Sequence, residues 1–240
     1  MSNIKSNIIN YWNKRSQSFV QHKKEELHSE QAQLWVNEIE RYVHLDSIQT
    51  ILDIGTGAGF LAILCSKHDC DVTGIDISPE MIHQAQNLSQ ELNVHIQFKV
   101  MDAEDLNFAD DSFDLVIARN VTWLMTNPFK AYEEWLRVLK PHGHLLNFDA
   151  DYGKDNFTQI SDLSNSHAHN DLEFSMLKES EHLKNAIDIN QHTRPTYDCQ
   201  ILEKCNVSKI EVDPSVYQRV NRPQSQFYNP SPLFGIHVVK

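Results

Sequence analysis

Apolar runs of strand length alternate with segments of helical periodicity through the middle of the chain. The apolar runs occupy residues 49–54, 71–77, 95–100, 113–118 and 143–150. Between them, apolar positions follow a helical spacing at 58–68, 79–92 and 128–139. Parallel strands need long crossovers and are buried on both faces, so this alternation predicts a doubly wound α/β fold.

Residues at the predicted helix ends support these boundaries. Ser78 is a suitable N-cap before Pro79, and Asn127 precedes Pro128 in the same way. Pro141 and Gly143 are expected to close the helix over 128–139 and turn the chain into the next strand.

Four segments are expected along the chain. Residues 1–45 form an N-terminal helical lid, and 46–150 form the ligand-binding core. Residues 151–194 are a polar insertion with a helical middle, expected to act as a substrate cap because long structureless loops are uncommon in compact domains. Residues 195–240 return to the core as one helix and two strands, 207–213 and 233–240.

Composition narrows the choice of ligand and compartment. Acidic residues outnumber basic ones by 33 to 21, which gives a formal charge of -12 and disfavours a nucleic acid partner. No apolar run approaches the ~20 residues that span a bilayer, so we expect a cytoplasmic protein that is not embedded in a membrane. The four cysteines form no CxxC pair and are expected to be reduced.

The stretch ILDIGTGAGFL, at 51–61, places glycines at 55, 57 and 59 between a strand and a helix. Bare backbone there lets a ligand approach closely. The spacing GxGxG differs from the GxGxxG of dinucleotide sites, and Asp53 would repel a phosphate but suit a cation. Asp76, 21 residues beyond Gly55, ends the second strand, where a carboxylate can accept hydrogen bonds from ribose hydroxyls. These features favour a nucleoside ligand without phosphates.

Five motifs in this order resemble those of the class I S-adenosylmethionine-dependent methyltransferases: LDIGTGAGF, GIDIS, MDAEDL, FDLVIARNVTWL and EWLRVLKPHGHLLNFD. The last block is similar to the branch that contains ubiquinone and menaquinone biosynthesis methyltransferases. The resemblance implies a Rossmann-like, seven-stranded, mostly parallel sheet with an antiparallel last strand. It also implies S-adenosyl-L-methionine as methyl donor, S-adenosyl-L-homocysteine as product, and a small-molecule acceptor.

The resemblance implies a set of donor-binding residues. They are Asp53, Gly55, Thr56, Gly57, Asp76, Ile77, Met81, Asp102, Ala103 and Arg119. Tyr11 and Phe19 are candidates for a lid over the donor, although a helix face packed on the domain would use the same residues. Gly59 can serve either helix packing or the ligand, and Asp102 can belong to an ordinary turn.

Candidate acceptor-binding residues are Asn120, Trp123, Tyr152 and Arg194, and Arg194 is expected to bind an anionic group. Phe157 and Phe174 are candidates for an apolar wall. No catalytic residue is assigned, because methyl transfer needs a base only when the acceptor is protonated. His28, His144, His167, His169 and His192 are candidates for such a base. No metal site is expected from His167, His169 and Asp171.

Two other functions share this architecture. An NAD-dependent oxidoreductase would use the same strand–turn–helix unit, although the glycine spacing and Asp53 disfavour it. A noncatalytic nucleoside-binding sensor or scaffold would keep the donor site without transferring a methyl group. The acceptor, the atom methylated and the choice between monomer and homodimer are left open by the sequence.

Overall fold

A single seven-stranded sheet runs through the part of the chain that the structure describes. The computed structural model describes residues 2–159, 172–222, 225, 227 and 230–240. The strand order is β3-β2-β1-β4-β5-β7-β6, and β7 runs antiparallel to both β5 and β6 while the other pairs are parallel. The predicted mixed sheet with an antiparallel last strand is therefore confirmed. The strands are β1 (Thr50–Ile54), β2 (Asp71–Asp76), β3 (Gln97–Val100), β4 (Phe113–Arg119), β5 (Leu139–Ala150), β6 (Lys209–Asp213) and β7 (Leu233–Val239).

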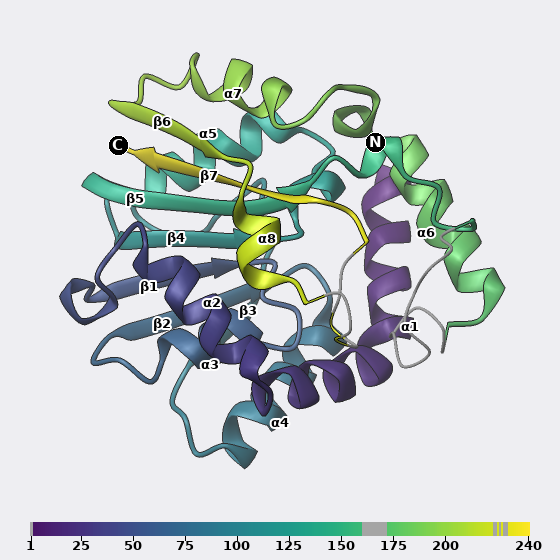
Figure 1. Ribbon diagram of the computed structural model, residues 1–240, viewed down its shortest axis with the longest axis horizontal. Helices are drawn as coiled ribbons and strands as arrows, with labels where there is room; N and C mark the ends of the chain where they lie inside the picture. Colours follow the sequence, from purple (N-terminus) through teal and green to yellow (C-terminus); the bar gives the residue numbers. More distant parts are fainter. Residues whose placement is uncertain (1, 160–171, 223–224, 226, 228–229) are drawn as a thin grey trace.

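Helices cover both faces of the sheet and its carboxyl edge. In Figure 1, α2 and α8 lie in front of the sheet, α5 lies behind it, and α1 stands across the ends toward which β1 and β4 point. The sequence order reverses between β1 and β4, and ligands of such sheets bind in the crevice outside that point. The helices are α1 (Ser2–Leu27), α2 (Glu30–Glu40), α3 (Phe60–Cys65), α4 (Pro79–Glu91), α5 (Pro128–Val138), α6 (Phe174–Ala186), α7 (Thr196–Leu202) and α8 (Val216–Val220).

The core is built from the continuous apolar strands and from one face of each covering helix. Ile51, Leu52, Leu115 and Val116 have no exposed surface, as expected for central strands buried on both sides. On α2, Trp35 is fully buried and contacts Phe148 of β5 edge-on, with ring centroids 5.3 Å apart. The helix α2 is thus fastened to the sheet itself.

Two predicted helix caps are confirmed. The hydroxyl of Ser78 accepts the Met81 N–H at 3.1 Å, and the Asn127 side chain accepts the Lys130 N–H at 3.1 Å. The Ser78 hydroxyl also donates to Oδ1 of Asn13 at 2.7 Å. Because Asn13 lies on α1, the cap of α4 also holds α1 in place.

The expected turn at Pro141 and Gly143 is wrong in detail. The helix α5 ends at Val138 and β5 begins at Leu139, so Pro141 and Gly143 both lie within the strand. His142 takes the positive φ of 64°, and the pairing register of β4 and β5 shifts between Phe113 and Leu115. The chain therefore enters the sheet before Pro141 and accommodates the irregularity as a bulge.

None of the described helices combines the length and apolarity needed to cross a membrane.

We expect Ser78→Ala to lower the free energy of unfolding by about 1–3 kcal/mol, because it removes both a helix cap and the contact with α1. Asn127→Ala is the matched control, since it removes a cap alone and should cost about 1 kcal/mol. Urea denaturation measures both losses, and hydrogen exchange should show added opening of α1 only in the Ser78 variant. Unchanged exchange in α1 would contradict the link between the two helices.

Candidate active site at the carboxyl ends of β1, β2 and β4

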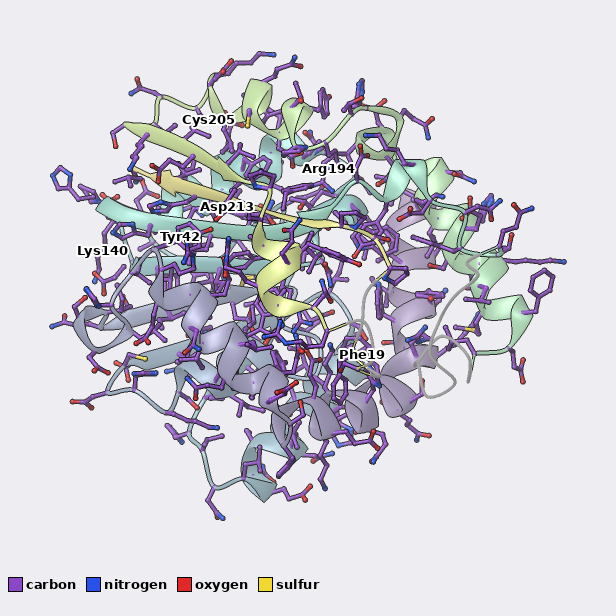
Figure 2. The ribbon with its side chains drawn as sticks, viewed as in Figure 1. Phe19, Tyr42, Lys140, Arg194, Cys205 and Asp213 are labelled. Atoms are coloured by element: carbon purple, nitrogen blue, oxygen red, sulfur yellow. The ribbon has the colours of Figure 1, made fainter. Side chains whose placement is uncertain are left out.

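A cavity of about 280 Å³ lies where α1 crosses the carboxyl ends of the central strands. Every site residue predicted from the sequence lines it except Arg194: Tyr11, Phe19, Asp53, Gly55, Thr56, Gly57, Asp76, Ile77, Met81, Asp102, Ala103, Arg119, Asn120, Trp123 and Tyr152. Figure 2 shows Phe19 on α1 and, well apart from it, Arg194 near β7. No residue of α2 lines the cavity, so of the two N-terminal helices α1 alone borders it.

The turn after β1 approaches its neighbours too closely for side chains. At Gly55 φ is +60°, and an added Cβ would lie 2.5 Å from a methyl group of Val121. At Gly57 φ is +55°, and an added Cβ would lie 3.0 Å from the Phe19 ring. Gly59 is different: it does not line the cavity, and its Cβ direction faces Phe98 and Ala85. Gly59 therefore serves helix–strand packing.

Asp53 fastens this turn to the helix that follows it. Its Oδ2 accepts the Thr56 hydroxyl at 2.6 Å and the Ala62 N–H at 3.1 Å. The residue is only 2% exposed, and burial raises the pKa of Asp53 to about 7 against the opposing effect of these hydrogen bonds. Asp53 borders the cavity, but its hydrogen bonds go to the turn and to α3.

Asp76 joins the glycine turn to the end of β2. Its Oδ2 accepts the Gly57 N–H at 3.0 Å, and its Oδ1 accepts the Ser78 N–H at 2.9 Å. Burial raises the pKa of Asp76 to about 6, although these backbone donors lower it. Each oxygen accepts one of these two hydrogen bonds, and the Ile77 N–H also lowers the pKa of the carboxyl group. Ser78, not Asp76, caps α4.

Asp102 belongs to a turn and to an ion pair at the same time. Its Oδ1 accepts the Glu104 N–H at 2.9 Å, and its Oδ2 lies 2.6 Å from the Lys5 ammonium on α1. Glu104, which sequence reasoning missed, is buried; it also pairs with Lys5 at 2.6 Å and accepts the N–H groups of Thr126 and Asn127. Its partners are distant in the chain, so the local DAED pattern gave no sign of this role.

Arg119 and Lys23 share one carboxylate at the other end of the cavity. Glu26 lies 2.8 Å from Arg119 and also binds the Lys23 ammonium. Burial opposes ionisation of Glu26, but Arg119 and Lys23 lower its pKa to about 2. Burial also lowers the pKa of Lys23 to about 8, despite the attraction of Glu26. The Arg119 guanidinium lies over the ring of Trp35 at 4.2 Å from its centroid.

Aromatic side chains form a wall beside the β4–α5 loop. Trp123, Tyr152 and Phe157 are buried, and their ring centroids lie 5.5–5.8 Å apart. The Tyr152 hydroxyl donates to Oδ1 of Asn120 at 3.1 Å, and the Trp123 indole donates to the Asn120 carbonyl at 3.0 Å. Phe174, a candidate for the same wall, is 56% exposed and does not line the cavity.

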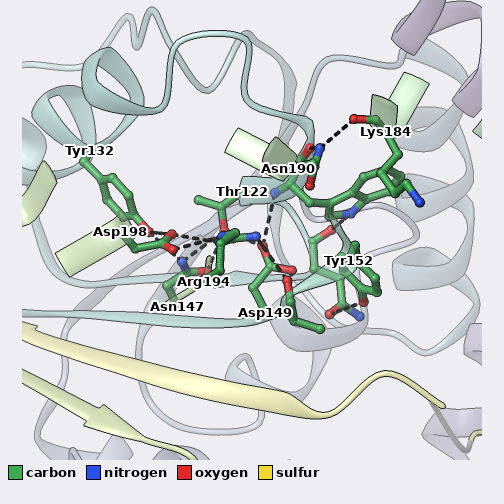
Figure 3. Close-up of polar contacts among 12 residues, drawn as sticks. Thr122, Tyr132, Asn147, Asp149, Tyr152, Lys184, Asn190, Arg194 and Asp198 are labelled. Carbon is green, nitrogen blue, oxygen red and sulfur yellow. Dashed lines mark hydrogen bonds and ion pairs between the residues drawn. The ribbon is translucent and has the colours of Figure 1, made fainter. Parts of the chain in front are cut away.

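The expected role of Arg194 does not fit its position. The side chain is fully buried and ion-paired to Asp198 at 2.8 Å and to Asp149 at 3.2 Å. Thr122, Tyr132 and Asn147 complete the hydrogen-bonded cluster, as Figure 3 shows. Asp149 also accepts the Trp123 N–H at 3.2 Å, so the cluster supports the cavity wall from behind. Arg194 does not line the cavity, so its guanidinium stabilises the fold and does not bind a ligand there.

Three of the candidate bases, His28, His144 and His192, lie among the described residues, and none of the three borders the cavity. His28 binds the Lys24 carbonyl, His144 pairs with His237 and His192 stacks on Tyr197. His167, His169 and Asp171 lie outside the described residues. His22, not considered from the sequence, does line the cavity. Among the described residues, no three His, Cys, Asp or Glu side chains are arranged to hold a metal.

Residues 52–147 match the family model described as "Methyltransferase domain". These residues form a class I S-adenosylmethionine-dependent methyltransferase domain. The domain spans the strands, the glycine turn and the Asn120 loop that border the cavity. The helix α1 and the segment after β5 lie outside it.

Similar proteins match between two fifths and four fifths of this chain. An uncharacterized methyltransferase, YcgJ, of Bacillus subtilis (strain 168) is 38% identical over 100 residues, which cover 41% of this chain and 40% of that protein. The ubiquinone/menaquinone biosynthesis C-methyltransferase UbiE of Bdellovibrio bacteriovorus is 30% identical over 58% of this chain and 59% of its own length. The chain thus spans about half the length of these curated relatives. A SAM dependent methyltransferase from Aquifex aeolicus shares the fold, with a TM-score of 0.52, 19% identity, and coverage of 80% of this chain and 81% of that one.

We expect Arg194→Met to lower the free energy of unfolding by about 3–5 kcal/mol, because it leaves Asp149 and Asp198 buried without a cation. Burial already raises the pKa of Asp149. Without the cation, the buried carboxyl groups would stay protonated in the folded state at pH values where the unfolded state has released those protons. The loss of unfolding free energy should therefore grow as the pH rises above about 4. Urea denaturation at acidic and neutral pH measures this, with Arg41→Met, an exposed change of the same type, as control. A loss under about 1 kcal/mol would contradict the structural role.

Proposed function

We propose that this chain transfers the methyl group of S-adenosyl-L-methionine to a small-molecule acceptor. The observation that carries the proposal is Asp76, a partly buried carboxylate that borders the cavity beside the glycine turn and accepts one backbone hydrogen bond on each oxygen. Two adjacent ribose hydroxyls are suited to that pair of acceptors. Membership of residues 52–147 in the methyltransferase family supports the same donor.

The remaining donor contacts follow from the lining of the cavity. Ile77, Met81 and Ala103 offer apolar surface for an adenine ring, and Asp102 lies at the same end. Gly55 and Gly57 offer bare backbone near the sugar and the sulfur. Tyr11 and Phe19 of α1 line the cavity opposite this turn, and we propose that α1 closes over the bound donor.

Methyl transfer requires mainly that the protein align the acceptor atom with the methyl group and the sulfur of the donor. When bound, the donor supplies a methyl group on a positively charged sulfur, and an acceptor atom displaces that sulfur in line. The wall of Trp123, Tyr152 and Phe157 excludes water and holds the acceptor, and the aromatic faces tolerate the cation. Tyr152 fixes the Asn120 side chain, which borders the same space. We propose that the 151–194 segment, through Tyr152, Phe157 and Leu177, selects the acceptor.

We expect Asp76→Ala to weaken binding of S-adenosyl-L-homocysteine by about 1–3 kcal/mol, because the ribose hydroxyls lose a charged acceptor. Isothermal titration calorimetry measures the loss, and Asp71→Ala, an exposed position at the start of the same strand, is the control. Titration with NAD separates the oxidoreductase alternative: binding of NAD without S-adenosyl-L-homocysteine would reject the proposal.

Binding of S-adenosyl-L-homocysteine should weaken as the pH falls below about 6. Burial raises the pKa of Asp76 to about 6, and hydroxyl donors favour its ionised form. Protonation therefore opposes binding, by up to about tenfold per pH unit below that pKa. Calorimetry across this range tests the point, and Asp76→Asn should lose the pH dependence. A flat profile for the wild-type protein would mean that the ribose does not use this carboxylate.

A further inference from the structure

Arg15 is a buried cation that borders the cavity without a carboxylate partner. It lies on α1 and is 6% exposed, and its Nε has no hydrogen-bond partner. One guanidinium nitrogen lies 3.5 Å from the Tyr11 hydroxyl, and the group lies 6.0 Å from the centre of the Trp12 ring. None of the carboxylates in the described ranges forms an ion pair with it.

The other buried cations show what this arrangement lacks. Lys184 pairs with Glu181 at 2.9 Å, and Arg194 pairs with Asp149 and Asp198. A buried charge without a counter-ion is strongly destabilising, and a guanidinium binds carboxylates and phosphates through paired N–H groups. Arg15 is therefore suited to an anion that enters the cavity from outside.

Charge is distributed unevenly along the cavity. Asp76, Asp102 and Glu104 border one end, where Lys5 pairs with the last two. Arg15, Lys23 and Arg119 border it from α1 and β4, and Glu26 pairs with the last two of these. The amino-acid part of the proposed donor carries an ammonium beside its carboxylate, and that carboxylate is the competing partner for Arg15.

We propose that the methyl acceptor is an organic anion whose carboxylate or phosphate binds Arg15 while its apolar part packs on the Trp123, Tyr152 and Phe157 wall. This inference rests on the proposed function and specifies its substrate class. The lining supports both parts, because aromatic side chains and an unpaired guanidinium border one cavity.

The first test identifies the charge of the methylated product. The full-length protein is incubated with donor labelled on its methyl group and an ultrafiltered cell extract, and the labelled products are passed over an anion exchanger at about pH 8, where carboxylates and phosphates are ionised. We expect the label in the retained fraction. Label only in a neutral or cationic product would overturn the inference and leave the methyltransferase proposal standing. Binding of S-adenosyl-L-homocysteine with no transfer to any product would reject both.

The second test assigns the anion site to Arg15. Arg15→Gln should reduce kcat/KM for the retained acceptor by roughly 10–100-fold, the range expected for a charged hydrogen bond, with less than about twofold change in S-adenosyl-L-homocysteine affinity. Lys14→Gln, an exposed neighbour paired with Glu179, is the matched control and should change neither. Arg15→Lys should recover part of the activity.

Two further measurements separate this role from a structural one and from donor binding. Removing an unpaired buried charge should leave Arg15→Gln at least as stable as the wild-type protein in urea denaturation. Affinities for S-adenosyl-L-homocysteine and for 5′-methylthioadenosine, which lacks the amino-acid carboxylate, should both be unaffected. Loss of affinity for the first ligand alone would place Arg15 on the donor carboxylate and overturn the inference.

Discussion

The site depends on one tight turn held between two carboxylates, of which one is buried and one is partly buried. Asp53 binds the turn to the helix that follows it, and Asp76 binds the Gly57 N–H from the neighbouring strand. Burial raises the pKa of both residues. The backbone and hydroxyl donors lower it again and so favour the ionised carboxylates. Burying these carboxylates is electrostatically unfavourable, but their hydrogen bonds fix the conformation of the backbone that borders the cavity.

The helix α1 completes the cavity because polar contacts fix it at three points. Lys5 joins its first turns to Asp102 and Glu104, Asn13 binds Ser78 in its middle, and Glu26 binds Arg119 near its end. These contacts place aromatic side chains of α1 opposite the glycine turn. The Lys5–Asp102 pair is partly exposed and contributes little by itself, whereas Glu26 and Glu104 are buried. Held at both ends, the helix keeps its register over the site.

The sequence predicts those features that depend on neighbouring residues. Alternating apolar runs predicted the strands, and the helix caps at Ser78 and Asn127 were read from local pattern. Residues at the carboxyl ends of parallel strands meet at one edge, so Asp53, Asp76 and Asn120 were expected together, and all three border the cavity. Arg194 could not be placed in this way: its partner Asp149 lies 45 residues away, and an isolated arginine in a polar segment resembles a ligand-binding group.

The cavity is bordered partly by residues inside the family match and partly by residues outside it. Residues 52–147 hold the turn, Asp76 and the Asn120 loop, whereas Arg15, Tyr152 and Phe157 lie outside that range. YcgJ of Bacillus subtilis and UbiE of Bdellovibrio bacteriovorus match 41% and 58% of this chain. In the proposed function, α1 and the segment after β5 border the space for the acceptor. The proposed anion site follows from the same arrangement, because the buried Arg15 and the aromatic wall border one cavity and a buried charge is weakly screened. Selection by charge thus needs no change in the donor-binding motifs.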